Sequence, residues 1–170
     1  MTEKLKAALE QYSNNNNANF SFEALQEGGY YAETNIIFKG EKICETPFHL
    51  GVYILGNEIQ IVSSYEYVFK DYDNQKDFKD ISELFHEKYE LKFFYDYEMS
   101  SLNTVYSEEY EDEIPDEDTI QGLISMAVLL NRMMVHSYLI MKMQKADPKT
   151  TFDIISEEED SYFTSEFKFC

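Results

Sequence analysis

The longest apolar stretch of the chain runs from Ile120 to Met143, and its apolar residues recur with helical spacing. One side of the predicted helix is formed by Ile120, Leu123, Ile124, Ala127, Leu130, Met134, Tyr138 and Met141. The opposite side is apolar as well, with Met126, Leu129, Met133 and Ile140. We therefore expect this helix to be covered on two sides. Pro115 and Asp116, followed by two more carboxylates, form its start signal.

The same stretch is close to the length that a membrane span needs. Arg132 and His136 lie near its middle, and an acidic run precedes it. A central arginine costs about 2.5–3.5 kcal/mol even on the most permissive insertion scale. We therefore interpret the stretch as a core helix of a protein that does not enter a membrane.

A β-hairpin is the clearest pattern in the first half of the chain. Strands of β-branched and aromatic residues over 48–55 and 58–62 flank the pair Gly56-Asn57. Such a pair suits a two-residue hairpin loop, because these loops need positive backbone angles. Residues 65–69 extend the second strand in this interpretation.

The remaining elements follow from weaker patterns. A helix over 2–12 ends at the asparagine run 14–17, because asparagine competes with the helical backbone. Two strands follow, near 20–25 and over 30–38. Asp77 is predicted to cap a helix over 78–89. Two further strands span 91–98 and 102–110, and in the first of them Phe93 and Tyr95 share a face.

We expect one α+β domain over 1–146, followed by an acidic, aromatic tail over 147–170. Asp147-Pro148 ends the long helix in this interpretation. The tail contains many aromatic residues, which are costly to leave in water. It is therefore expected to dock on its own domain or on another protein.

The negative charge of the chain limits the kinds of molecule that it can bind. Its 33 acidic residues against 14 basic ones give a formal net charge of −19. Such a surface repels phosphate backbones, which argues against direct binding of nucleic acid. It favours encounters with a basic protein partner. The two cysteines, Cys44 and Cys170, form no disulfide framework, which fits a cytoplasmic protein.

The order of elements is helix, strands ending in a hairpin, helix, two strands and a long helix. It predicts an α+β fold with an antiparallel sheet and helices packed on one face. From Asp77 to Met134 this order resembles the bacterial YbjN family and, through the same fold, the class I type III secretion chaperones. The aromatic tail after Pro148 and the asparagine run depart from that pattern. The resemblance implies a small, often dimeric, non-enzymatic bacterial module that holds or regulates other proteins.

The residues themselves suggest no catalytic chemistry. His49, His86 and His136 lack metal-ligand spacing, neither cysteine has an evident activating neighbour, and no glycine-rich phosphate loop is present. We therefore predict that the protein is no enzyme and uses no cofactor or metal. Arg132 within the apolar helix is expected to form a salt bridge with Asp96, Glu98 or an acid of the connector, or else to anchor an anionic ligand.

Two functional hypotheses remain. The first is a homodimeric, chaperone-like or regulatory interaction module that uses the sheet edge or the long helix. The second is an acidic inhibitor or immunity-type protein that neutralises a basic enzyme, such as a nuclease. The candidate partner-binding residues are Met126, Met133, Met134, Met141, Glu111, Asp112, Glu113, Phe163 and Phe167. The methionines either line an adaptable groove or fill an irregular core.

Overall fold

The computed structural model describes residues 2–16, 18–26, 28–38, 46–65, 75–90, 92–96, 98–99, 101–111, 115–157 and 167–169. Within these ranges the fold is α+β, as the sequence predicts. The elements in chain order are α1 (Thr2–Asn15), β1 (Ser21–Leu25), β2 (Gly29–Phe38), β3 (Thr46–Leu55), β4 (Glu58–Tyr65), α2 (Gln75–Tyr89), β5 (Lys92–Asp96), β6 (Ser101–Glu109), α3 (Glu117–Gln144), α4 (Pro148–Glu157) and β7 (Phe167–Phe169).

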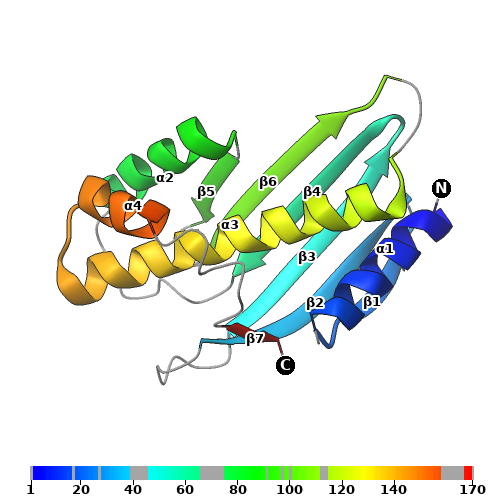
Figure 1. Cartoon of the computed structure of the whole chain (residues 1–170), viewed down its shortest axis with the longest axis horizontal. Coiled ribbons are helices and arrows are strands. Elements are labelled where there is room, and N and C mark those ends of the chain that lie inside the picture. The colour runs from blue at the N-terminus through cyan, green and yellow to red at the C-terminus, as the bar shows by residue number, and fades with distance from the viewer. Residues whose placement is uncertain are drawn as a thin grey trace.

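The strands form one antiparallel sheet in the order β1-β2-β3-β4-β6-β5, and the short β7 pairs with β2 beyond the end of β1. The described helices all lie on the same side of this sheet, and α3 crosses it diagonally (Figure 1). The burial of β4 shows the consequence, because every second residue is buried from Ile59 to Tyr65. The core therefore lies between the helices and this face of the sheet.

The predicted hairpin is confirmed as β3 and β4, joined at Gly56 and Asn57. Gly56 has a φ of 70°, a conformation that suits glycine because it has no Cβ. Phe93 and Tyr95 share the helix-covered face, as predicted, since Phe93 contacts the Phe85 ring and Tyr95 contacts the Phe78 ring.

The long helix α3 is covered by the chain's own elements. Both α1 and α4 contact it, and α1 lies alongside it over β1 and β2 (Figure 1). On the second apolar side of the helix, Leu129, Met133 and Ile140 are at most 7% exposed, and Met126 is half-buried. The described elements of the same chain therefore cover most of the apolar circumference of α3, and the expected dimer stays a prediction.

By length and composition α3 could cross a membrane. However, 72% of its most apolar 18-residue window is buried within the protein. Its hydropathy is therefore explained by a central position in the core.

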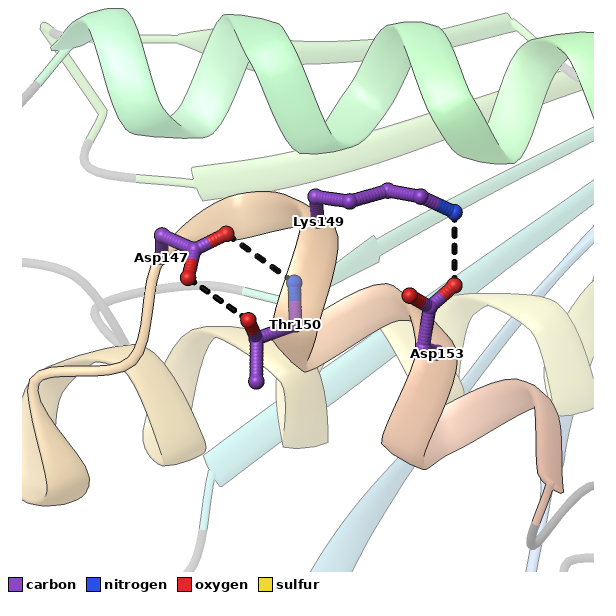
Figure 2. A network of polar contacts seen from close by, with 4 residues as sticks. All are labelled: Asp147, Lys149, Thr150 and Asp153. Carbon is purple, nitrogen blue, oxygen red and sulfur yellow. Dashed lines mark hydrogen bonds and ion pairs between the residues drawn. The ribbon is translucent and has the colours of Figure 1, made fainter.

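The prediction missed the helix α4, which follows α3 directly. Asp147 does not simply end α3: its carboxylate accepts hydrogen bonds from the backbone N–H of Thr150 (3.0 Å) and from the Thr150 hydroxyl (2.6 Å), as an N-cap does (Figure 2). Pro148 is the first helical residue, where a missing N–H costs nothing. Lys149 pairs with Asp153 one turn later, at 2.6 Å (Figure 2).

The described parts of the tail pack on the rest of the chain. Ile155 of α4 is fully buried, and Phe152 meets the ring of Phe85 edge-on. At the end of the chain, β7 pairs with Ile36–Phe38 of β2.

Two helix boundaries differ from the prediction. The first helix continues into the asparagine run and ends at Asn15. The second begins at Gln75, so Asp77 lies inside its first turn, where a carboxylate still interacts favourably with the helix dipole. The predicted extension of the hairpin over 66–69 lies outside the described residues.

Truncation of Met133 tests the position of α3 in the core. Met133 is fully buried, so Met133→Ala should lower the free energy of unfolding by about 2–5 kcal/mol. Met143 on the same helix is 65% exposed, and Met143→Ala should change the free energy of unfolding by no more than about 0.5 kcal/mol. Urea unfolding measures both variants, and equal losses would contradict this placement.

The N-cap of α4 should make stability depend on pH. The hydrogen bonds from Thr150 hold the pKa of Asp147 below its usual value of 3.8. A lowered pKa stabilises the folded state above the unfolded-state pKa, and this contribution disappears as the pH falls through the folded-state pKa. Asp147→Ala should therefore lower the urea midpoint at neutral pH but not well below pH 3.8, while Asp147→Asn keeps the acceptor and should lose less. An equal loss at both pH values would contradict this assignment.

Candidate functional site

Three of the four methionines in the predicted partner site lie in the core. Met133, Met134 and Met141 are at most 4% exposed, and Met126 is half-buried. Their side chains therefore fill the interior of this chain, which agrees with the second interpretation of the methionines as core residues. Their role in partner binding stays a prediction.

The predicted acidic and aromatic positions can be placed only in part. Glu111 is exposed just after β6. Asp112, Glu113 and Phe163 lie outside the described residues. Phe167 belongs to β7, whose backbone pairs with β2.

Arg132 is buried in the core and is only 7% exposed. It lies close enough to the hydroxyl groups of Tyr12 and Tyr65 to act on their ionisation. Burial raises the pKa of both tyrosines, and the Arg132 charge partly offsets this. Of the acids that were expected to pair with Arg132, Asp96 accepts hydrogen bonds from the backbone N–H groups of Glu98 and Met99. The predicted salt bridge of Arg132 stays a prediction.

A buried polar cluster connects α3 to the centre of the sheet. Asn131 Nδ2 donates to Ser63 Oγ at 2.8 Å, and lies 3.3 Å from Thr104 Oγ1. The hydroxyl groups of Ser63 and Thr104 also share a hydrogen bond. All three residues are fully buried, so the cluster fixes the position of α3 along the sheet rather than forming an accessible site.

The opposite face of the sheet carries no described helix (Figure 1). We call it the open face. It consists of the strand residues that alternate along each strand with the residues of the core. The cross-strand register places one row of these residues across the sheet: Tyr31, Gly51, Val62, Val105 and Lys92. Tyr31, Val62 and Val105 are half-buried and Lys92 is exposed, so apolar side chains reach solvent in the middle of this face.

Aromatic residues extend the open face over β2 and β3. A Cβ at Gly51 would lie 2.6 Å from the Tyr53 ring, so the Tyr53 side chain lies over Gly51. The Tyr31 ring stacks on His49, and the Tyr31 hydroxyl shares a hydrogen bond with His49 Nδ1. These aromatic rings give this part of the face apolar surface together with polar hydroxyl groups.

One end of the open face is acidic. Glu58 of β4 and Glu109 of β6 stand directly opposite each other, which is unfavourable for two like charges. Each carboxylate is held separately, since Glu58 accepts from Ser107 Oγ and Glu109 accepts from Asn57 Nδ2 at 3.1 Å. A basic group placed between them would relieve this repulsion.

On the helix-covered side of the same end, Glu108 is held by two tyrosines. Its Oε2 accepts from the hydroxyl groups of Tyr106 (2.6 Å) and Tyr110 (2.9 Å). Burial is the larger cause and the Glu108 contact the smaller one in raising the pKa of both tyrosines, for Tyr110 to about 12.

The edge strand β5 adjoins a shallow groove. Its volume is about 520 Å³, and it is lined by Phe78, Phe93, Phe94 and Tyr95 together with Lys76, Lys79 and Ser82. Phe94 points to the open face and is 47% exposed. None of these residues was among the partner-binding residues predicted from the sequence. Their signal was the run of three aromatic residues in a strand, which becomes informative only once β5 is known to lie at an edge.

The described residues contain no group of three or more His, Cys, Asp and Glu side chains arranged as metal ligands. Comparison of the sequence with known proteins finds no matching family model and no matching curated protein. The resemblance to the YbjN family and to type III secretion chaperones therefore remains an expectation from the order of elements.

Removal of the Glu108 charge should shift the ionisation of Tyr110. In Glu108→Gln the pKa of Tyr110 should fall below about 12 but stay above 10, because the carboxylate beside the phenol disfavours the phenolate while burial, the larger cause, remains. The raised pKa favours the folded state below pH 10, and this contribution is lost as the pH rises through about 12.

Ultraviolet titration of tyrosinate follows this shift. The chain has 14 tyrosines, so the Tyr110 signal is obtained as the difference from Tyr110→Phe, in the wild type and in Glu108→Gln. Glu10→Gln on α1 is the control for a lost exposed carboxylate. An unchanged Tyr110 titration in Glu108→Gln would show that Glu108 does not act on it.

Proposed function

We propose that this protein is a non-enzymatic interaction module, chaperone-like or regulatory, that binds other proteins as a dimeric α+β domain. The observation that supports the proposal is the open face of the sheet. It presents Val62, Val105 and the aromatic rings of Tyr31 and Tyr53 without a covering helix among the described residues. A partly apolar face of this kind is a typical docking surface for a protein partner.

The rigidity of the face adds to this support. The strands beneath it are paired on both sides from β2 to β6. Tyrosine side chains lose little conformational entropy on binding, and their hydroxyl groups provide polar contacts. The face is therefore organised before a partner arrives, which lowers the cost of association.

The alternative is an acidic inhibitor that neutralises a basic enzyme. The specific observation in its favour is the pair Glu58 and Glu109 at one end of the open face, with Glu111 exposed after β6. An arginine or lysine of the partner placed between the two carboxylates would replace repulsion by attraction. This alternative uses the same face but a different part of it.

Affinity capture with face-directed variants separates the two functions. The bait is the full chain, presented to lysate of its native host at low and at high salt. For the interaction module, Val62→Lys should reduce the amount of the main captured protein at least about tenfold at both salt concentrations, because it places a charge in the middle of the contact. For the inhibitor, high salt should release the main captured protein. The double variant Glu58→Lys with Glu109→Lys should not capture it.

Two controls make this test decisive. Glu10→Lys changes an exposed charge on α1, far from the open face, and should leave capture unchanged. Circular dichroism shows that each variant is folded. A captured protein whose retention is insensitive to Val62→Lys and to the Glu58 and Glu109 changes would overturn both functions.

A further inference from the structure

Strand β5 forms one edge of the sheet. It pairs with β6 through the register Lys92 to Val105 and Asp96 to Ser101, and no described strand pairs with its other side. A strand at the edge of a sheet presents a row of backbone N–H and C=O groups to which another strand can bind.

The centre of this edge lacks a proline and a charged residue, two of the features that prevent strand pairing. The five residues Lys92–Asp96 contain no proline, and their centre is the aromatic run Phe93, Phe94 and Tyr95. Charged residues occur only at the two ends, as Lys92 and Asp96. Edge strands that must stay single usually carry a proline, a bulge or a charge at the centre.

The opposite edge of the sheet has such a protection. At the centre of β1 lies Glu23, which is exposed. If two copies paired antiparallel through β1, Glu23 would face its own counterpart, and two like charges directly opposite each other are destabilising. The two edges of this sheet are therefore not equivalent.

The sequence of β5 is complementary to itself. In an antiparallel pair with two-fold symmetry centred on Phe94, Lys92 of each copy stands opposite Asp96 of the other. Phe93 stands opposite Tyr95, and Phe94 opposite Phe94. Opposite charges and aromatic pairs directly across two strands are both stabilising. A contact in which each copy uses the same patch also closes after two chains.

The surroundings of β5 leave room for a second copy. The groove of about 520 Å³ between α2 and β5 is lined by Phe78, Phe93 and Tyr95 on the helix-covered side. In the paired arrangement, the Phe93 and Tyr95 side chains of a second copy would lie on this same side of the sheet, next to the groove. On the open face, the 47% exposed ring of Phe94 would be covered by its counterpart.

We propose that a second copy of this chain pairs with the free edge of β5, antiparallel and with Lys92 opposite Asp96, so that one continuous sheet spans both chains. The inference rests on the proposed function, because it assigns the contact of the proposed dimer and joins the two open faces into one surface.

Charge exchange at the two ends of β5 tests the pairing. Light scattering and sedimentation over a range of concentrations should give a mass twice the 20.1 kDa of the chain. Lys92→Asp places Asp opposite Asp, and Asp96→Lys places Lys opposite Lys. Each variant should raise the dimer dissociation constant roughly tenfold or more. An equimolar mixture of the two variants restores both opposite-charge pairs, so it should form heterodimers with nearly wild-type affinity.

Other variants separate the contact from folding. Asp96 accepts hydrogen bonds from Glu98 and Met99, so Asp96→Asn, which keeps an acceptor, shows the effect of the charge alone. Phe94→Asp changes an exposed side chain and should give a folded monomer. Lys6→Asp on α1 makes the same charge change as Lys92→Asp outside the contact and should leave the dimer intact.

A wild-type chain that is monomeric at every concentration would overturn the inference, and so would a dimer that Lys92→Asp and Phe94→Asp leave intact. If the dimer fails but Val62→Lys still abolishes capture of a partner, only the pairing of β5 is wrong. If the dimer behaves as expected but no partner depends on the open face, the pairing stands and the proposed function fails.

Discussion

The fold depends on the burial of one helix that is apolar on every side. Helix α3 has buried residues at every position from Ala127 to Val135, so it needs cover over its whole circumference. The sheet, α1 and α4 supply this cover, since each of them contacts the helix. All the described helices lie on the side of the sheet that α3 occupies. They therefore leave the other face of the sheet uncovered (Figure 1). The open face is thus a consequence of what α3 requires.

The polar groups on α3 determine where it lies. Apolar packing alone has no directional partners, whereas the buried Asn131 amide needs hydrogen-bond partners at defined positions. It finds them in Ser63 and Thr104, which come from the neighbouring central strands β4 and β6. Arg132, the next residue, lies near Tyr12 and Tyr65 and so relates α3 to both α1 and the sheet. These two neighbouring polar residues therefore relate α3 to the sheet and to α1.

Much of the fold could be predicted from the sequence because its signals are local. The spacing of apolar residues identifies α3, and the Gly56-Asn57 turn identifies the hairpin. The helix α4 was missed because Asp147-Pro148 was interpreted only as a stop, although the same two residues begin a helix when Thr150 supplies the capping contacts. The covering of α3 could not be foreseen, because it depends on which elements meet in space.

The candidate surfaces were harder to predict, for the same reason. The aromatic run of β5 has no special meaning in the sequence and gains one only from its place at the sheet edge. Met133 and Met134 were candidates for a partner groove, yet both are buried against the chain's own core. Periodicity alone cannot say whether an apolar side faces a partner or the same chain.

Hydrogen exchange of α3 in very dilute protein tests the central claim most directly, which is that one chain covers this helix by itself. The account predicts that the backbone amides of residues 127–135 exchange only through global unfolding, and therefore as slowly as those of β3 and β4 at every protein concentration. Exchange that becomes much faster on dilution, while the sheet strands β3 and β4 stay protected, would show that a second subunit covers α3 and would contradict the account.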